Sequence, residues 1–476
     1  MIIVYLFVES YPIFMFRMRN FLVVFILITI YSCNQTPQQS SLTYFGGQII
    51  NPKGDYVFLV KDGNIVDSTL LDEEHKFLLK FNLDKESLFH FKHGNEFQYL
   101  YLQPNDSVLV RLNTWDFDES MVFSGKGAEK NNFLINLFVM NEIEDIKFYP
   151  FYQSDSKSFS KKIDSSITSK EKLFLKFKSS NQNVSEGFLK IVNAGIYLPT
   201  YRKKENYAYG HKKLLNLNKY PTLDKQFYNY RKKINLNDSS LIQYHSYQNY
   251  LNSLVYNKAS QIIEKDTLNQ NISLIALKVI VEQSNNKTIK DLLLKQTIME
   301  SFLKDSPCKF HDDELEFYYN NSSNKEDKLR ITKLNNDSNS LINNDLFKDF
   351  VIIDSQNSLK YINSLILNRN TVIYFWSLDS MSEEYLISRI NFLETHFPSI
   401  LFIGINTNSS KASIDKTMSL PLNNQYFLPD NSYGKKHISS NFPRAILINK
   451  NGIIENSFTF LASKHFNHLI ADLEKK

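Results

Sequence analysis

The sequence predicts a multidomain chain with a β-rich, sandwich or barrel-like N-terminal domain, a helical middle region and a C-terminal α/β domain. Three observations lead to this prediction. Short apolar runs separated by turn residues recur about every ten residues over 43–128. Apolar residues follow a helical spacing over 129–344, and strand-like segments alternate with helix-like ones over 345–476. A chain of 476 residues is also too long for one ordinary core.

Composition describes a folded protein and excludes some partners. Hydrophobic residues make up 42% of the chain and charged residues 22%, which is typical of globular proteins. A net charge of +5 over 476 residues forms no strongly basic surface, so we expect no nucleic-acid partner. No motif in the chain requires a cofactor or a metal ion, and we expect neither.

The N-terminus has the features of an export signal. Residues 21–30 form an apolar run that is long enough for a signal-peptide core and too short to span a bilayer, and Arg17 and Arg19 precede it. The run ends in Ile30-Tyr31-Ser32-Cys33, which resembles a bacterial lipobox. That resemblance implies that Cys33 carries a diacylglycerol, that residues 1–33 form the signal peptide and lipobox, and that 34–42 is a polar tether. We therefore expect a lipid anchor in the membrane and a protein that faces the periplasm. The alternative is an uncleaved membrane anchor with an incidental cysteine.

The β-rich domain is expected over 43–128. Turn residues at 51–55 and 61–64 separate its first strands. The predicted strands are 44–50, 56–60, 65–71, 76–81, 88–92, 97–102 and 107–112.

Motifs in this domain resemble the N-terminal domain of Bacteroidetes envelope lipoproteins that end in thioredoxin domains. They are the segments 67–72 (DSTLLD), 103–108 (QPNDSV) and 123–133 (FSGKGAEKNNF). The family usually has glycine at the position of Asn105, and asparagine is well able to replace glycine at positive φ. His90 and His93 are expected on opposite faces of a strand, as surface and edge residues rather than metal ligands.

The middle region, 129–344, reads as an irregular helical bundle with breaks at 179–183 and 320–324. An acidic cluster at 312–316 is interpreted as the start of a helix, where carboxylates favour the dipole. Cys308 and His311 could form a thiolate–imidazole pair, but no third orienting group is in view, so we expect a buried or incidental free thiol.

The C-terminal domain, 345–476, alternates strands and helices. Strands are predicted at 371–376, 399–406, 424–428, 444–449 and 452–459, and helices at 383–395, 410–418 and 463–474. The end of the first strand, Phe375-Trp376, and the later Phe442-Pro443 followed by 448–452 (INKNG) resemble the thioredoxin fold of the membrane-tethered TlpA-like thiol–disulfide oxidoreductases. The resemblance implies thiol–disulfide oxidoreductase activity. It also implies an active-site Cys-x-x-Cys pair after the Phe-Trp strand end and a cis-proline at Pro443.

The two cysteine positions of that motif hold Ser380 and Glu383. Disulfide exchange needs an attacking thiolate and a second thiol, and neither side chain supplies one. Cys33 is expected to be blocked by lipid, and Cys308 belongs to another region. No histidine in the local loop could activate Ser380 for hydrolysis. We therefore expect a degenerate active site without catalytic residues.

The resemblance leaves a peptide-binding face, which it places at Trp376 and Pro443. That face favours a protein-binding or scaffolding module for exported or envelope proteins. A fold kept for stability alone is the second interpretation. A thiol–disulfide oxidoreductase that works through Cys308 is a third.

Overall fold

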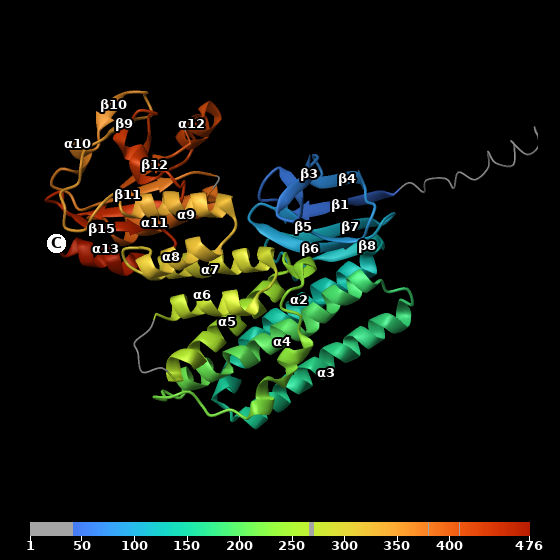
Figure 1. Ribbon diagram of the computed structural model, residues 1–476. Coiled ribbons are helices and arrows are strands. Elements are labelled where there is room, and N and C mark those ends of the chain that lie inside the picture. Colours follow the sequence, from blue (N-terminus) through green and yellow to red (C-terminus); the bar gives the residue numbers. More distant parts are fainter. Residues whose placement is uncertain (1–40, 266–270, 379, 409) are drawn as a thin grey trace, which may run out of the picture. The chain divides into compact units, whose positions relative to one another are not determined.

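The computed structural model describes residues 41–265, 271–378, 380–408 and 410–476 (Figure 1). The predicted signal peptide, Cys33 and nearly all of the tether lie outside these residues. The chain divides into two compact units, one ending at Ile135 and the other running from Asn136 to Lys476.

The first unit contains two four-stranded sheets, with strand orders β4-β1-β7-β8 and β3-β2-β5-β6. The strands are β1 (Leu42–Ile50), β2 (Tyr56–Lys61), β3 (Asn64–Leu70), β4 (Lys76–Asn82), β5 (Ser87–His93), β6 (Glu96–Leu102), β7 (Ser107–Asn113) and β8 (Val122–Lys126). The two sheets face each other through buried aromatic rings, since Phe45 on β1 lies 5.3 Å from Phe91 on β5 between ring centroids. Every strand predicted here is present within two residues of its expected bounds, and β8 is an additional one.

Two local expectations in this unit have different outcomes. Asn105 has a φ of 65°, as its replacement of glycine implies. His90 and His93 lie on opposite faces of β5, but His93 is buried rather than a surface residue. Its ring accepts a hydrogen bond from the Lys53 amide at 2.9 Å and contacts the Tyr56 carbonyl at 3.0 Å. His93 therefore ties the loop before β2 to β5.

The second unit begins with helices and short 3-10 segments. They are α2 (Ala128–Phe148), which starts in the first unit, η1 (Tyr149–Gln153), α3 (Ser156–Ser180), α4 (Glu186–Leu214), η2 (Lys225–Lys233), η3 (Ser239–Leu241), α5 (His245–Lys265), α6 (Ile272–Gln283), α7 (Lys287–Lys304), α8 (Asp312–Asn321) and α9 (Lys325–Ser338). The predicted breaks lie between α3 and α4 and between α8 and α9. At each break a polar side chain caps the next helix: Ser185 for α4 and Asn324 for α9.

The C-terminal part of this unit is a seven-stranded sheet with the order β10-β9-β13-β12-β11-β14-β15. Its elements are β9 (Val351–Ile353), β10 (Leu359–Tyr361), α10 (Asn363–Ile366), β11 (Thr371–Trp376), α11 (Glu383–His396), β12 (Leu401–Asn406), α12 (Lys411–Met418), β13 (Gln425–Phe427), η4 (Tyr433–His437), β14 (Arg444–Ile448), β15 (Ile454–Thr459) and α13 (Phe466–Glu474). β11 pairs in parallel with β12 and antiparallel with β14, and β14 pairs antiparallel with β15. This arrangement is a thioredoxin-like fold, and it covers part of the chain.

The central strand β11 is buried on both faces. Val372, Tyr374 and Trp376 point into the core that α11 and α13 cover. Ile373 and Phe375 point into the opposite core. The uninterrupted apolar run of this strand follows from its central position, because both faces of a strand in a covered sheet need apolar side chains.

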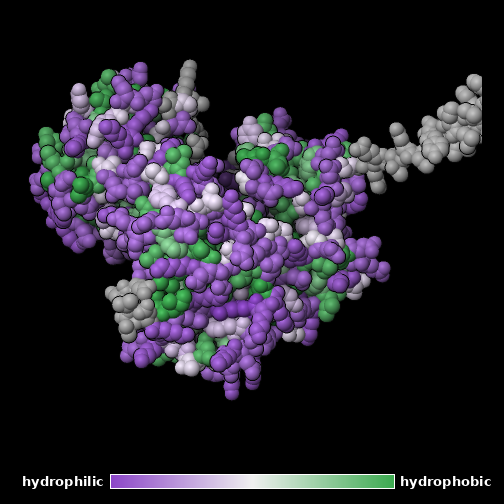
Figure 2. Space-filling model, viewed as in Figure 1, coloured by the Kyte–Doolittle hydropathy of each residue, from purple (hydrophilic) through white to green (hydrophobic). Residues whose placement is uncertain are grey.

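On the face of the molecule shown in Figure 2, hydrophilic residues predominate and the hydrophobic ones form separate patches. Across the ranges that the structure describes, every helix is either too short or too polar to cross a bilayer.

Candidate degenerate active site

Ser380, at one of the two positions where the resemblance implies a cysteine, lies in the loop that joins β11 to α11. Ser380 is exposed, and its hydroxyl donates to the Ser377 carbonyl at 2.9 Å. The Ser380 amide donates to the same carbonyl at 3.0 Å, and the Ser377 amide donates to the Ser380 hydroxyl at 3.2 Å. The Ser380 hydroxyl therefore closes a local turn. Asp379 lies outside the described residues.

Glu383 is the first residue of α11, and the preceding Ser382 caps this helix by accepting from the Tyr385 amide at 3.2 Å. A carboxylate in the first turn is favoured by the helix dipole and has no sulfur chemistry. The nearest histidines in sequence have other contacts, His396 with the Phe392 carbonyl and His437 with the Ser340 hydroxyl. Within the described residues, Ser380 therefore has no histidine to act as its base.

Trp376 does not form an exposed aromatic wall, and this expectation is wrong. Its side chain is 1% exposed and packs in the core with Leu386 and Ile390 of α11. Its indole nitrogen donates to Gln425 at 3.1 Å. The physical reason is the alternation along β11, which turns Trp376 to the same face as Tyr374, beneath α11.

The loop around Pro443 also differs from the expectation. The Phe442–Pro443 peptide bond is trans, and the cis peptide bond found in the described residues is Ser306–Pro307. Phe442 is half-buried, and its ring lies 6.3 Å from that of Phe302 on α7 and 6.2 Å from that of Phe458 on β15. A helix of the same chain thus packs against the loop to which the resemblance assigns peptide binding.

A buried carboxylate holds this loop on α9. Asp337 is 1% exposed and lies in the last turn of α9. One of its oxygens accepts from the Ser439 amide at 2.8 Å and from the Ser439 hydroxyl at 2.6 Å, and the other accepts from the Ser440 amide at 2.8 Å. The backbone amides of Ser439 and Ser440, in the loop before Pro443, are therefore bonded to α9.

Arg444, the first residue of β14, completes the junction. Its guanidinium is 1% exposed and donates to the carbonyls of Asp337 and His437, each at 2.8 Å, and to the Ser340 hydroxyl at 3.0 Å. It also donates twice to the Ser457 carbonyl. Burial lowers the pKa of the guanidinium, and the nearby Asp337 opposes this shift. We call Asp337, Ser340, His437, Ser439 and Arg444 the junction network.

His437 is the titratable member of this network that is held neutral. Burial, together with the neighbouring charges of Arg444 and Lys436, lowers its pKa to about 3. Its Nδ1 contacts the Ser340 hydroxyl at 2.9 Å. The imidazole is therefore neutral near neutral pH, and its protonation would place a second cation beside Arg444.

Cys308 is buried beside β15, as expected for a structural thiol. It is 3% exposed, and its amide donates to the Phe458 carbonyl at 2.8 Å. Burial, together with the negative charge of Asp305, raises the pKa of the thiol to about 12. His311 contacts Asp305 at 2.9 Å. The thiolate that exchange chemistry requires is therefore disfavoured at this position.

The acidic cluster begins α8, as predicted, with Asp312, Asp313 and Glu314 in its first turn. Glu314 differs from a solvated helix end because its side chain is fully buried and accepts a hydrogen bond from Asn271. Burial raises the pKa of its carboxyl.

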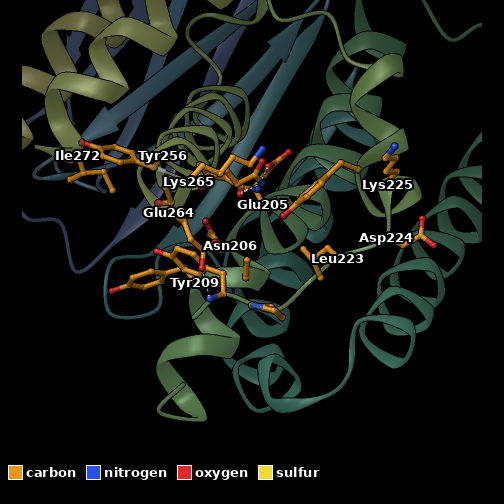
Figure 3. Close-up of a pocket in the computed structure, with 18 residues that line it drawn as sticks. Glu205, Asn206, Tyr209, Leu223, Asp224, Lys225, Tyr256, Glu264, Lys265 and Ile272 are labelled. Carbon is orange, nitrogen blue, oxygen red and sulfur yellow. Dashed lines mark hydrogen bonds between the residues drawn. The ribbon is translucent and has the colours of Figure 1, made fainter. Parts of the chain in front are cut away.

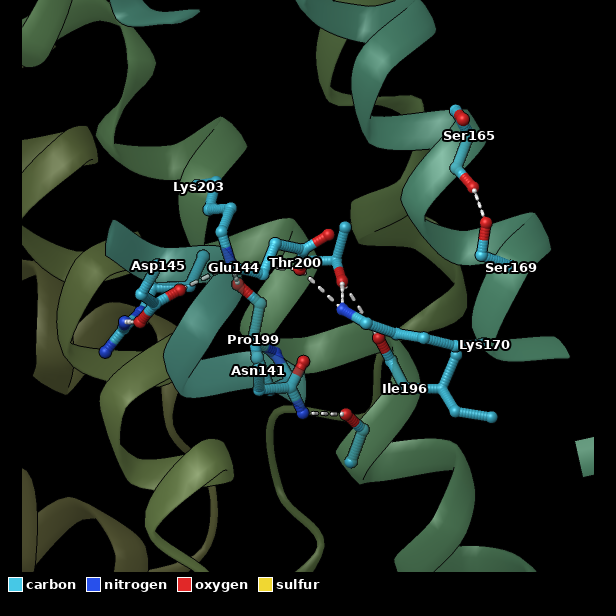
Figure 4. Close-up of polar contacts among 12 residues, drawn as sticks. Asn141, Glu144, Asp145, Ser165, Ser169, Lys170, Ile196, Pro199, Thr200 and Lys203 are labelled. Atoms are coloured by element: carbon cyan, nitrogen blue, oxygen red, sulfur yellow. Dashed lines mark hydrogen bonds and ion pairs between the residues drawn. The ribbon is translucent and has the colours of Figure 1, made fainter. Parts of the chain in front are cut away.

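Sequence reasoning missed a second buried polar network, in the helical region (Figure 4). Lys170 on α3 is 2% exposed and donates to Glu144 on α2 at 2.6 Å and to Thr200 on α4 at 2.9 Å. Lys203 on α4 is also buried and pairs with both Glu144 and Asp145. These charges come from three helices, so no local spacing in the sequence reveals them. They tie α2, α3 and α4 together.

Comparisons with known proteins give only distant structural likenesses over a part of the chain. No protein-family model matches the chain, and no curated protein does. Among solved structures, a putative thiol-disulfide oxidoreductase from Bacteroides vulgatus is 19% identical with a TM-score of 0.25, covering 28% of this chain and 99% of that one.

Two further structures resemble the same share of the chain. A putative thiol:disulfide interchange protein DsbE from Chlorobium tepidum is 14% identical with a TM-score of 0.24, covering 28% of this chain and 99% of that one. A thiol:disulfide interchange protein from Bacteroides sp. is 18% identical with a TM-score of 0.24, covering 29% of this chain and 93% of that one. These likenesses are too distant to carry an activity over to this chain, whose thioredoxin-like fold rests on its own strand order.

Proposed function

We propose that this chain is a lipid-anchored component of the bacterial cell envelope whose thioredoxin-like domain binds or scaffolds envelope or exported proteins without disulfide exchange. The observation that carries the proposal is the chemistry left at the former active site. Ser380 and Glu383 occupy the cysteine positions, and Cys308 is a buried thiol of raised pKa. A fold without exchangeable sulfur can still present a surface.

The surface for a partner is best placed at the free edge of the sheet. The loop before Pro443 is bonded to Asp337 and packed against Phe302. By contrast, β10 ends the sheet, and Leu359 and Tyr361 on it are 70% and 63% exposed. An edge strand with exposed apolar side chains and unpaired backbone groups is suited to an extended segment of another protein.

Envelope anchoring rests on the sequence around Cys33. The apolar run at 21–30 and the lipobox-like Ile30-Tyr31-Ser32-Cys33 support export and acylation. Two or three acyl chains on Cys33 would hold the protein stably at the membrane, facing the periplasm.

The alternative is a thiol–disulfide oxidoreductase that works through Cys308. It would need a thiolate within reach of a substrate disulfide. The 3% exposure of Cys308 and its pKa of about 12 argue against it.

Two experiments in cells test the proposal. Metabolic labelling with palmitate should mark the full chain and should not mark Cys33→Ser; labelling of both would contradict the anchor. A photoreactive phenylalanine analogue placed at Tyr361 should crosslink to other envelope or exported proteins. The same analogue at Phe442 is the matched control and should crosslink within the chain. Crosslinks to other proteins from 442 but not from 361 would refute the assigned surface.

A further inference from the structure

A cavity of about 590 Å³ lies in the helical region, away from the thioredoxin-like sheet (Figure 3). α4 and α5 form two of its walls, and the segment 220–228, which leads into η2, forms a third. Its volume is within the range of small-molecule sites.

The floor of the cavity is a buried carboxylate whose bonding is complete. Glu205 on α4 has a fully buried side chain and pairs with Arg231 through two guanidinium nitrogens. It also accepts from the Tyr230 hydroxyl at 2.7 Å and from the Asn257 amide at 2.6 Å. These contacts fix the positions of α4, η2 and α5 around the cavity, so the cavity is held open by the fold rather than by a ligand.

Several neutral polar groups around the cavity are left without partners. The side chains of Asn206, Ser253 and Ser260 line it and make no hydrogen bond to any residue in the described part of the chain. The buried hydroxyl of Tyr228 lies near Asn257 and Gln261 but makes no hydrogen bond of good geometry there. Gln261, which donates to Asn257 at 2.9 Å, also lines the wall. Donors and acceptors that the protein does not satisfy are available to water or to a ligand with hydroxyl groups.

Aromatic rings supply the remaining wall. Tyr209, Tyr220, Tyr228 and Tyr256 line the cavity. Three of these rings are held in place: the Lys212 ammonium lies 4.5 Å from the centroid of Tyr220, the Arg231 guanidinium lies 3.9 Å from that of Tyr228, and the Tyr256 hydroxyl donates to Glu300 at 2.8 Å. Fixed tyrosines offer flat apolar faces next to polar hydroxyls.

The charges at the cavity cancel. Glu205, Asp224 and Glu264 contribute three negative charges, and Lys225, Lys265 and the Arg231 partner of Glu205 contribute three positive ones. An ionic ligand finds no surplus of opposite charge, and a wholly apolar ligand would bury the unpartnered amide and hydroxyl groups at a cost. The walls match a neutral molecule that combines many hydroxyls with flat C–H faces.

From this combination we infer that the cavity is a binding site for a neutral saccharide of one or two rings. The hydroxyl groups of the sugar pair with Asn206, Ser253, Ser260 and Gln261, and its ring faces lie on Tyr209 or Tyr228. This inference does not depend on the function proposed for the thioredoxin-like domain.

Titration calorimetry of the full chain in detergent tests the site, with cellobiose, maltose and N,N′-diacetylchitobiose as probes. At least one disaccharide should give saturable binding. Asn206→Leu and Gln261→Leu keep the side-chain volume and remove hydrogen-bonding groups, so each should weaken that binding about tenfold. Gln182→Leu, at an exposed position between α3 and α4, is the matched control and should bind like the unmodified chain.

Two results would overturn the inference. One is the absence of saturable heat with all three disaccharides. The other is binding that Asn206→Leu and Gln261→Leu leave at full strength while their thermal unfolding matches the unmodified chain, because the sugar would then be bound elsewhere. Thermal unfolding of each variant separates a lost contact from a lost fold.

Discussion

The loop at Ser380 and the junction at Arg444 belong to the same thioredoxin-like domain and differ sharply in how they are bonded. The hydroxyl of Ser380 is exposed and makes its contacts with Ser377, three residues away. Arg444 is 1% exposed and donates five hydrogen bonds, two of which go to Asp337 and Ser340, outside the domain. The former chemical centre is therefore a local turn, and the neighbouring loop is a structural joint.

This difference indicates which side chains the stability of the fold depends on. Removing an exposed side chain whose hydrogen bonds are to neighbouring residues leaves few donors or acceptors without a partner. Removing a buried charged group leaves several carbonyls without donors in a place that water does not reach. We therefore expect the fold to tolerate changes at Ser380 far better than changes in the junction network that bonds the domain to α9.

The largest effect is expected from Arg444→Met. It removes all five hydrogen bonds of the guanidinium and should lower the free energy of unfolding by about 4 kcal/mol. Urea unfolding followed by circular dichroism measures the loss. Arg330→Met is the matched control, because Arg330 is exposed and pairs with Glu326 on the surface of α9, and it should change stability by less than about 0.5 kcal/mol. Equal effects of the two variants would contradict the comparison.

Phe302→Ala should come next. The Phe302 ring is fully buried and packs against Phe310 and Phe458, so its truncation leaves a cavity between α7 and β15. We expect a loss of about 3 kcal/mol, measured in the same way. Phe392→Ala is the matched control, because the Phe392 ring on α11 is 40% exposed. It should lower the free energy of unfolding by less than about 1 kcal/mol.

The pH dependence of stability tests the neutral state of His437. Its pKa is about 3 in the folded chain and has an ordinary value of 6.5 when unfolded. The unfolded state therefore binds the proton first as pH falls, so the stabilising contribution is complete above pH 6.5 and declines on acidification towards pH 3. Between pH 7 and pH 5 this decline amounts to about 2 kcal/mol.

His437→Asn should remove that part of the decline, whereas His396→Asn, at an exposed histidine, should leave it in place. Urea unfolding at both pH values gives the comparison. A decline in His437→Asn as steep as that of the unmodified chain would show that His437 does not contribute it.

The smallest effect is expected from Ser380→Ala. The hydroxyl closes an exposed turn whose backbone hydrogen bond to the Ser377 carbonyl remains, so the free energy of unfolding should fall by no more than about 0.5 kcal/mol. A loss comparable to that of Arg444→Met would mean that the two regions do not differ as described.

Local patterns predicted the elements of this protein better than its contacts. The strands from β1 to β7 follow from apolar runs and turn residues, and so do the strands and α-helices from β11 to α13, whereas η4 was not predicted. β9 and β10 were missed because each has only three residues, too few for a periodicity to appear.

The site could be predicted only in part. Ser380 and Glu383 are visible in the sequence, and neither side chain carries sulfur. The burial of Trp376 was missed because the family motif fixes a residue type, while the direction of its side chain is set by the core beneath α11. The hydrogen bond between Ser439 and Asp337 was missed because the two residues are 102 positions apart, so no local pattern in the sequence links them.

The most direct test of the central claim is a disulfide-exchange assay on the full chain in detergent, with dithiothreitol as the reductant and insulin as the substrate. The account predicts that insulin is reduced at the rate seen without the protein, and that Cys308→Ser gives the same rate. Catalysed reduction that Cys308→Ser abolishes would contradict it, because the buried thiol would then be the working nucleophile of an oxidoreductase.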